Sequence, residues 1–511
     1  MVSRAIFLGV LRSLFVGFAF CVLMAPVVTA QASLDELRNA TFRQPTDLNA
    51  WVDLGNAYLE RGQFDDAQKA FLEAVSLDYR SDDAHFGLGL AEFERGDYPA
   101  ALFQFNEVTR LFPERFDGHF NEAVTLVKLR RFDEAAAAFR EAIENSVEAS
   151  SVEKVEAYRG LAGQLKRIED YAGAADAYGA ALEIRPNDNE LTFLQAEALY
   201  QAGMGLEALP SLSDLEARTD DHKVSVLIAN IYVQAEQDDY AVSSLQRALR
   251  NAQATSNTQA QGTILVKLGL LQSDLGREAE ATSAFQRASA ADTSSWEARY
   301  NLGVNYLERG QPESAIGYLQ NAITINPESG AAYLALATAY DQVGQLNEAF
   351  SNAEAAQSRL EDPLLLSQAN FIVGRGLYRQ GNYEASLEAF EGVVEAQPDN
   401  AAAQLWAGLA QYGQANYDEA VQFIERSVQL DPESLEARVN LGAAYLASER
   451  YQDAELVYQL LVEDSPNDAD SHYNLGWSLL AQNQLEAAKE SWVRASDLGY
   501  EPAQDALQRY F

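Results

Sequence analysis

The feature that most constrains this chain is a pattern of apolar and small residues that returns about every 34 residues. Within residues 296–329, such residues recur every three or four positions on both sides of Gly310. That spacing predicts two amphipathic helices joined by a tight turn. Gly303 is small where the helices should cross and Leu319 supplies bulk beside it, while Pro327 closes the unit because it cannot continue a helix. Repetition at this period is typical of a helical solenoid.

The order of the marker residues resembles the tetratricopeptide repeat. In this unit the markers are Leu302, Gly303, Tyr306, Ala315, Ala322 and Pro327. The same markers recur through about thirteen units. The resemblance implies an all-α fold, a right-handed α-solenoid superhelix of about thirteen helix-turn-helix repeats, with about 26 helices plus end caps.

The repeat divides the chain into a solenoid and two ends. Residues 33–47 are expected to cap the first repeat, and residues 503–511 to form a helix over the last one, because a solenoid needs capped ends to stay soluble. The repeat covers residues 48–502, and its phase slips at three places, which are 150–154, 255–261 and 364–366. The slips define four sub-arrays, which are 48–149, 155–255, 262–363 and 367–502. Each slip is either a joint where curvature changes or, as we expect, a longer loop.

The middle of the chain follows the pattern least closely. Pro210 falls inside a predicted second helix there, and it should bend or shorten that helix because it lacks a backbone N–H and its ring clashes with the preceding turn.

Residues 1–30 have a different character from the repeats. Arg4 and Arg12 accompany an apolar run over residues 14–28, and small residues follow it at Ala30 and Ala32. This arrangement predicts a secretory signal peptide, and the alternative is a retained membrane anchor. We therefore expect an exported protein, periplasmic or extracellular in a bacterium.

Cleavage of this leader would also remove Cys21, the only cysteine, and with it any disulfide, thiol nucleophile or thiolate metal ligand. The formal charge of the whole chain is −39, and it becomes −41 once the two leader arginines are gone. Such an acidic surface repels nucleic acid and anionic lipid headgroups. Solubility or a salty habitat explains the charge, and the alternative is attraction to basic partners.

Patterns that carry catalysis or metal binding are sparse. No Gly-rich phosphate loop follows a strand, and no Gly-x-Ser-x-Gly elbow occurs. Acidic pairs such as Asp65 and Asp66 fall at turns and helix starts, where Asp caps free amides. His85 and His119 are one repeat apart and would be able to share a metal, but no cysteine or patterned carboxylate completes a ligand set. With His472, they occupy a position where other repeats place an aromatic ring. We predict no enzyme activity, no cofactor and no metal site.

In a fold of this kind, the resemblance implies that the first helix of each pair lines a concave groove. Aromatic residues recur at the inward positions of these helices, one turn to either side of the small Gly or Ala. They are Phe86, Phe93, Phe120, Phe193, Tyr200, Tyr300, Phe371, Tyr378, Tyr412, Tyr473 and Trp477. Such a row would suit the apolar anchors of a bound peptide or helix. The alternative is that the rings pack against the next repeat.

Basic residues cluster on the same predicted face. They are Lys128, Arg159, Lys166, Arg167, Arg375 and Arg379. These cations either capture a carboxylate of a partner or pair with neighbouring Glu and Asp residues. The two-carboxylate clamp of chaperone-binding relatives is not present: Asn56 and Asn121 match parts of its pattern, but Val52 and Asp117 stand where lysines would be needed.

The sequence thus predicts a non-catalytic protein–protein interaction scaffold that binds a partner peptide or helix in a concave groove, with a role in cell-envelope assembly or complex formation. The alternative is an accessory factor for polysaccharide or protein export across the envelope. Expected partners are proteins or peptides, with no nucleic acid, and no membrane once the leader is cleaved.

Overall fold

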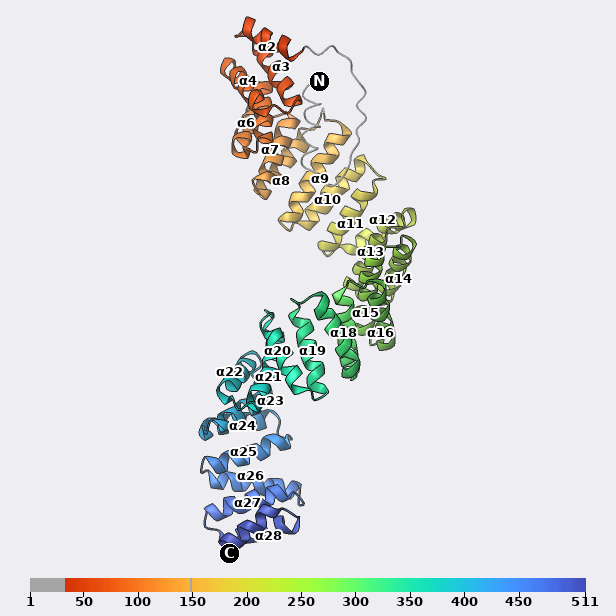
Figure 1. Cartoon of the computed structure of the whole chain (residues 1–511). Helices are drawn as coiled ribbons and strands as arrows, with labels where there is room; N and C mark the ends of the chain where they lie inside the picture. Colours follow the sequence, from red (N-terminus) through yellow and green to blue (C-terminus); the bar gives the residue numbers. More distant parts are fainter. Residues whose placement is uncertain (1–32, 148) are drawn as a thin grey trace. The chain divides into compact units, whose positions relative to one another are not determined.

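Helices make up all the regular secondary structure in the part of the chain that the computed structural model describes, residues 33–147 and 149–511. These residues form 28 helices and no strand (Figure 1). Helices α2 (Leu34–Arg43) and α29 (Glu501–Tyr510) flank 26 others, which alternate as first and second members of helix pairs. The prediction of an all-α solenoid of about thirteen repeats is confirmed. The predicted leader, residues 1–30, lies outside the described residues.

The chain divides into two compact units, 1–251 and 252–511. In the N-terminal unit the first helices of the pairs are α3 (Leu48–Glu60), α5 (Asp82–Glu94), α7 (Phe116–Lys128), α9 (Ser151–Arg167), α11 (Asn189–Gln201) and α13 (His222–Gln234). The second helices are α4 (Phe64–Leu77), α6 (Tyr98–Leu111), α8 (Phe132–Glu144), α10 (Tyr171–Ile184), α12 (Gly205–Arg218) and α14 (Asp238–Ala254). The boundary between the units falls within α14.

In the C-terminal unit the first helices are α15 (Thr258–Asp274), α17 (Trp296–Glu308), α19 (Gly330–Gln342), α21 (Pro363–Arg379), α23 (Ala401–Gly413), α25 (Leu435–Ala447) and α27 (Ala469–Ala481). The second helices are α16 (Glu278–Ala291), α18 (Pro312–Ile325), α20 (Leu346–Gln357), α22 (Tyr383–Ala396), α24 (Tyr417–Leu430), α26 (Tyr451–Asp464) and α28 (Leu485–Asp497). Each first helix from α15 to α25 contacts the first helix of the next repeat. The surface that these first helices share is termed the first-helix face.

The two helices of a pair cross where a glycine on the first meets a large side chain on the second. A Cβ atom added at Gly303 would lie 2.5 Å from Leu319, as the sequence predicts for this crossing. At Gly476 the added atom would lie 2.3 Å from the Trp492 ring, which is fully buried. These distances are shorter than any relaxed contact, so the crossing admits no larger residue without a shift of the helices.

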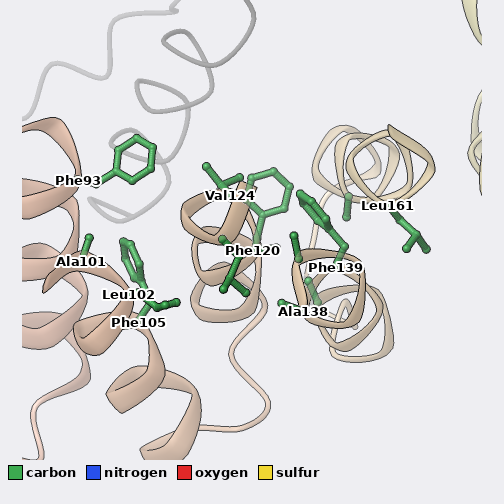
Figure 2. Packing of buried hydrophobic residues seen from close by; sticks show 14 of the residues in the cluster. Phe93, Ala101, Leu102, Phe105, Phe120, Val124, Ala138, Phe139 and Leu161 are labelled. Atoms are coloured by element: carbon green, nitrogen blue, oxygen red, sulfur yellow. The ribbon is translucent and has the colours of Figure 1, made fainter. Parts of the chain in front are cut away.

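Aromatic rings fill the space between packed helices in the N-terminal unit (Figure 2). Phe120 of α7 meets Phe139 of α8 edge-on, with ring centroids 5.5 Å apart. Phe105 of α6 is fully buried, as is Ala101 one turn before it. The small alanine side chains let the helix backbones approach closely, while the rings fill the remaining volume.

A recurring hydrogen bond ties each of several first helices to the turn before it. A side-chain nitrogen donates to the carbonyl oxygen of a proline six residues earlier. The pairs are Trp51 Nε1 with Pro45 (2.9 Å), His119 Nε2 with Pro113 (2.8 Å) and His472 Nε2 with Pro466 (3.1 Å). Tyr333 stands at the same position, and there the Arg359 guanidinium lies over its ring and donates to the Pro327 carbonyl instead. A carbonyl oxygen only accepts, so the ring nitrogens in these bonds carry the proton.

The phase slips lengthen helices. The expected longer loops occur at two of the three slips, where six residues (145–150) and five residues (358–362) connect the helices, compared with four residues between α4 and α5. The expectation is wrong at the slip between α14 and α15, where three residues connect them. Helices α9, α14, α15 and α21 each span 17 residues, whereas most others span 13 or 14. Capping side chains explain where three of them begin: Ser150 caps α9, Asn257 caps α15 and Asp362 caps α21. The residues after each cap are compatible with helix, so the extra residues add about one helical turn.

Helix α12 keeps 14 residues although Pro210 lies inside it, so the expected shortening did not occur. Pro210 is in the second turn of the helix, where a proline removes a single backbone hydrogen bond. The remaining hydrogen bonds of the helix are sufficient to maintain it. No helix of residues 33–147 and 149–511 has both the length and the apolar character needed to cross a membrane.

Candidate functional site

All the predicted binding residues lie on first helices, but their exposure and their contacts differ between the two units. In the N-terminal unit, Phe86, Phe93 and Phe120 are only 4–5% exposed. Phe86 packs on Phe105 of the second helix, with ring centroids 5.9 Å apart, and Phe93 packs on Tyr98 at 5.3 Å. The prediction that these three residues are accessible anchors for a partner is wrong, because their rings are buried between the two helices of each pair. The alternative is that these rings pack against the next repeat, whereas in these contacts each ring meets an aromatic ring on the second helix of its own pair.

The predicted cations of the N-terminal unit mostly have partners on the next repeat or on a ring. Arg159 pairs with Glu190 at 3.0 Å and Lys166 with Glu197 at 2.6 Å, so each joins α9 to α11. The guanidinium of Arg167 lies 4.9 Å from the centroid of the Phe132 ring. Lys128 is exposed. The paired cations are held by internal partners, which weakens their prediction as a carboxylate-capturing cluster.

Phe193, Tyr200 and Tyr300 are intermediate cases. Phe193 and Tyr200 pack at the margin of the core that α11, α12 and α13 share, and neither is fully buried. Tyr300 of α17 lies beside Trp296, with ring centroids 6.0 Å apart, and burial raises its pKa. These three side chains keep one partly exposed edge and have no cationic neighbour of the kind found on α21.

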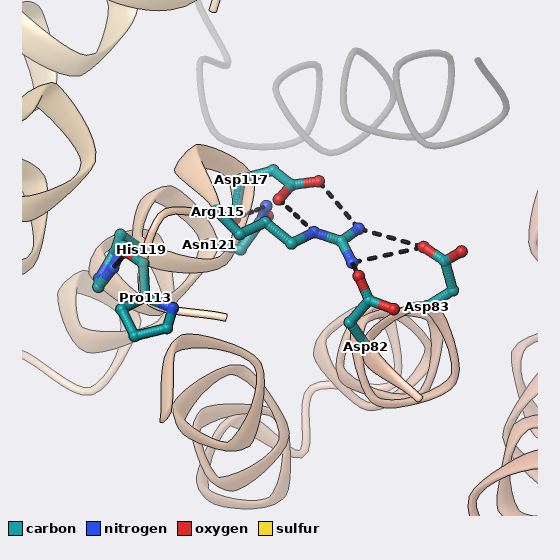
Figure 3. A network of polar contacts seen from close by, with 7 residues as sticks. All are labelled: Asp82, Asp83, Pro113, Arg115, Asp117, His119 and Asn121. Atoms are coloured by element: carbon teal, nitrogen blue, oxygen red, sulfur yellow. Dashed lines mark hydrogen bonds and ion pairs between the residues drawn. The ribbon is translucent and has the colours of Figure 1, made fainter. Parts of the chain in front are cut away.

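An arginine that the sequence reading missed organises the first-helix turns of the N-terminal unit (Figure 3). Arg115 directly precedes α7, and its Nε lies 2.7 Å from Asp117 Oδ1. Its Nη1 lies 2.7 Å from Asp82 Oδ2 at the start of α5, with Asp83 at 3.4 Å. The guanidinium also covers the Phe86 ring at 4.7 Å. In the sequence, only the proximity of Arg115 to Asp117 indicates an ion pair. Its partners Asp82 and Asp83 lie one repeat earlier and cannot be identified from that proximity.

The C-terminal unit gathers aromatic rings around one arginine that spans three first helices. Arg375 of α21 pairs with Asp341 of α19 at 3.0 Å, and its guanidinium lies 5.8 Å from the Trp406 ring of α23. The Tyr378 ring meets Trp406 edge-on at 5.4 Å and lies 5.2 Å from Tyr383. Arg375 therefore fixes the spacing of α19, α21 and α23, so its role is to hold the surface in shape.

The deeper members of this cluster are aromatic as well. Phe371, a predicted anchor, meets Phe390 edge-on at 5.6 Å, and Phe390 stacks on Trp406 at 6.0 Å. Trp406 was not predicted, although a tryptophan among the alanines of residues 401–413 is a visible signal.

The outer part of the cluster is open to solvent. Tyr412 of α23 is 38% exposed, and its ring lies 5.2 Å from Tyr417. Burial, and then the nearby Tyr383 and Tyr412 hydroxyls, raise the pKa of Tyr378. Burial, and then Tyr417, raise the pKa of Tyr412, so the phenols of Tyr378 and Tyr412 both keep their protons at neutral pH. Arg379 is exposed and has no ion-pair partner among the described residues. The partly exposed residues Tyr378, Arg379, Trp406 and Tyr412 are termed the aromatic surface.

Tyr473 and Trp477 of α27 are covered by the C-terminal helix. The Tyr473 ring lies 5.0 Å from Tyr500, and Trp477 meets Tyr510 of α29 edge-on at 5.5 Å. Both also pack on Trp492. Their prediction as groove anchors is wrong in this respect, because α29 takes the place that a further repeat, or a partner, would occupy.

His85, His119 and His472 form hydrogen bonds to the turns that precede their helices. Both ring nitrogens of His85 are engaged, Nδ1 with Gln104 Oε1 at 2.8 Å and Nε2 with the Tyr79 carbonyl at 3.0 Å. His85 therefore has no free nitrogen with which to share a metal with His119. The described residues contain no group of three or more potential His, Cys, Asp or Glu ligands.

Several carboxyl groups on first helices have pKa values above the usual range. Burial is the leading cause in each case, and besides Glu92 of α5 and Glu122 of α7 there are four further such groups, Asp53, Glu94, Glu156 and Glu308. Each lies in a different repeat, so no two of these four form the carboxyl pair that acid–base catalysis on a glycoside would need.

Comparison with known families supports the repeat assignment. Family models described as tetratricopeptide repeat match more than half of the chain. The matched residues are 52–116, 96–150, 120–189, 306–349, 374–434, 412–472 and 457–490.

Curated relatives are distant. The chain is 23% identical over 291 residues to a BBSome complex member of Bos taurus, covering 56% of this chain and 53% of that protein. It is 25% identical over 283 residues to a tetratricopeptide repeat protein 30 homolog of Drosophila pseudoobscura pseudoobscura, covering 53% and 39%. It is 25% identical over 188 residues to a protein O-mannosyl-transferase of Homo sapiens, covering 37% and 20%. The chain thus spans about half, or less, of the length of these relatives.

Solved structures with similar repeats include YrrB, a protein described as having an unusual peptide-binding site. The identity is 21%, the match covers 37% of this chain and 95% of that chain, and the TM-score is 0.33. For the structure of MamA the identity is 24%, the coverage is 34% and 92%, and the TM-score is 0.30.

Proposed function

The chain belongs to the tetratricopeptide repeat family, and we propose that it is a non-catalytic scaffold that binds a segment of a partner protein on the aromatic surface of its C-terminal unit. Proteins of this family are typically protein-interaction scaffolds. The proposal narrows that general role to one surface and to one type of ligand, a peptide or helix with apolar side chains and a carboxylate.

The observation that carries the proposal is the exposed edge of an aromatic cluster beside an unpaired arginine. Trp406 and Tyr378 present partly exposed rings, Tyr412 is more exposed, and Arg379 offers a free guanidinium. Tyrosine, tryptophan and arginine are the residues most enriched at the energetic centres of protein interfaces. In contrast, Phe86, Phe93 and Phe120 of the N-terminal unit are internal.

Contacts within the chain itself support the aromatic surface from beneath. Arg375 joins α19 to α21 and contacts Trp406 of α23, and the rings beneath the surface pack on one another. A preformed surface loses little conformational entropy on binding, so most of the ordering falls on the partner segment. Arg375 serves as a support in this proposal, and Arg379 as the group that meets the ligand.

We further propose that the protein acts outside the cytoplasm, in the periplasm or beyond, in assembly of a cell-envelope complex. The basis is the arginine-flanked apolar leader with small residues at its end. Sequencing the amino terminus of the protein purified from its source should give a chain that starts after Ala30 or Ala32. An intact leader in the cytoplasm would refute this part.

Site-specific photocrosslinking tests the binding surface. A photoreactive residue at Tyr412 should crosslink one partner in the envelope fraction of the source organism, and Trp406→Ala should suppress the adduct. The same residue at Leu456, which is 59% exposed on the second helix α26, is the matched control and should give no such adduct. Equal adducts at both positions, or an adduct indifferent to Trp406→Ala, would remove the aromatic surface as the site. Retention on polysaccharide gels that depends on Trp406 would favour the export-accessory function instead.

A further inference from the structure

A cavity of about 360 Å³ lies among α6, α7 and α8 of the N-terminal unit, built by residues that the proposed function does not use. The side chains that line it include His119 and Glu122 of α7, Thr109 of α6, and Glu134 and Glu141 of α8. Because two successive repeats contribute to its walls, the cavity has a shape that neither repeat would form alone.

The imidazole of His119 presents an unused acceptor at this cavity. His119 is 9% exposed, and its Nε2 donates to the Pro113 carbonyl at 2.8 Å. With the proton on Nε2, Nδ1 is left with a lone pair and has no hydrogen-bond partner. A buried acceptor without a donor is unfavourable, and its closest charged neighbour is another acceptor, Glu122 Oε2 at 3.9 Å.

The charges that line the cavity do not balance. Arg131 is its lining cation, and both its Nε and Nη2 bind the Glu134 carboxylate at 2.6 Å. Glu122 Oε2 accepts from the Thr109 hydroxyl at 3.3 Å, and the Asn106 amide, with its nitrogen turned toward Glu122, donates to Glu122 Oε1 at 3.1 Å. Glu141 is exposed and forms no ion pair among the described residues. The lining thus carries the carboxylates of Glu122, Glu134 and Glu141 against the single cation Arg131, and the His119 lone pair is the buried acceptor that no donor reaches.

We propose that this cavity binds an alkylguanidinium or alkylammonium group, the cation carried by arginine and lysine side chains and by free polyamines. Such a group brings several N–H donors and one positive charge to a site that offers acceptors and negative charge. Its alkyl stem lies along Leu102 and Ala138, which also line the cavity. An anion or a neutral acceptor would leave the imidazole and the carboxylates unsatisfied.

The electrostatics of Glu122 agree with this assignment. Burial raises the pKa of Glu122, and so do Glu141 and Glu134, whereas His119 and Thr109 act in the opposite direction. Asn106 of α6 and Arg131 also face the site. A bound cation stabilises the ionised carboxylate, so affinity should rise with pH until Glu122 is fully ionised.

Isothermal titration calorimetry of the full chain with agmatine, spermidine and N-acetyl-arginine amide tests the proposal, with the uncharged analogue N-acetyl-citrulline amide as a control. We expect the cations to bind and the uncharged analogue not to. Tighter binding of the arginine amide than of agmatine and spermidine assigns the site to a protein side chain, and the reverse order assigns it to a free amine. No heat of binding with any cation, or equal binding of the citrulline amide, overturns the proposal.

Three variants locate the site. Glu122→Gln and Glu141→Gln should each weaken binding by about tenfold, because each removes a charge-assisted contact. Glu73→Gln is the matched control: it removes one charge from the exposed position of α4 that corresponds to Glu141 in α8, and should bind as the unaltered chain does. Glu141 is exposed, so its variant is expected to fold, as circular dichroism would verify. Equal loss in all three variants would indicate attraction to the general negative charge and overturn the cavity.

Discussion

In the N-terminal unit, the cavity among α6, α7 and α8 presents carboxylates and an imidazole. In the C-terminal unit, α21 and α23 present tyrosine and tryptophan rings with one free guanidinium. Both regions are built from the same type of helix pair, in which a small residue of one helix contacts a large side chain of the other where the two cross. The difference shows that the residues that set the crossing are separate from those that set the surface chemistry. One repeat therefore supports an acidic cavity in one place and an aromatic surface in another.

The largest expected effect comes from removing a residue of the crossing. Trp492→Ala should lower the free energy of unfolding of the C-terminal unit by about 3–5 kcal/mol, because the ring is fully buried over Gly476. Trp406→Ala, at the partly exposed surface, should lower it by about 1–2 kcal/mol. Urea unfolding followed by circular dichroism measures both. Equal losses would mean that the aromatic surface is part of the core.

The histidines that fasten turns allow a second, smaller contrast. His85→Ala should destabilise the chain by about 1–3 kcal/mol, because His85 is 1% exposed and its removal leaves Gln104 and the Tyr79 carbonyl without their partner. His472→Ala removes a single hydrogen bond at a partly exposed site, and about 0.5 kcal/mol is expected. Thermal unfolding compares the two, and a larger loss at His472 would contradict the role of burial.

Substitutions in the two turns beside the aromatic surface should change the free energy of unfolding in opposite directions. Gly381 and Ala415 occupy equivalent turns with φ of 77° and 62°. Ala415→Gly should stabilise the chain by about 0.5–1 kcal/mol, because a left-handed residue with a Cβ is strained, and Gly381→Ala should destabilise it by a similar amount. Differential scanning calorimetry of both variants measures the shifts. Two shifts of the same sign would refute the strain argument.

The smallest expected effect is a pH dependence at the acidic cavity. Burial raises the pKa of Glu122 in the folded chain, so its contribution to stability is present at low pH and is lost as pH rises through the folded pKa. Glu122→Gln should therefore flatten this dependence and leave the chain more stable near neutral pH by about 0.5 kcal/mol. Urea unfolding at a series of pH values measures it.

Glu134→Gln is the control of opposite sign for that series. A hydrogen bond from Arg131 lowers the pKa of Glu134, so its contribution is present above the unfolded pKa and is lost as pH falls. If both variants changed the pH profile in the same direction, burial would not be the cause at Glu122.

Local sequence was sufficient to predict the elements and the crossings. The 34-residue period located the helix pairs, and Gly303 with Leu319 marked a contact that the structure contains. The pairing of Arg115 with Asp82 could not be predicted, because it depends on how far one repeat is rotated against the next. The cover of Trp477 by α29 depends on how α29 packs on α27, and the burial of Phe86 depends on packing against Phe105 within its own pair. Neither contact can be derived from the repeat period. Whether the aromatic surface binds a partner remains a prediction.

The hydrogen bond from His472 to the Pro466 carbonyl indicates where the array can be shortened. Its donor and acceptor lie six residues apart, one in α27 and the other in the turn before that helix, so a cut between them separates the pair from either side. Shortened versions made for crystallisation or display should therefore keep each proline turn together with the helix that follows it.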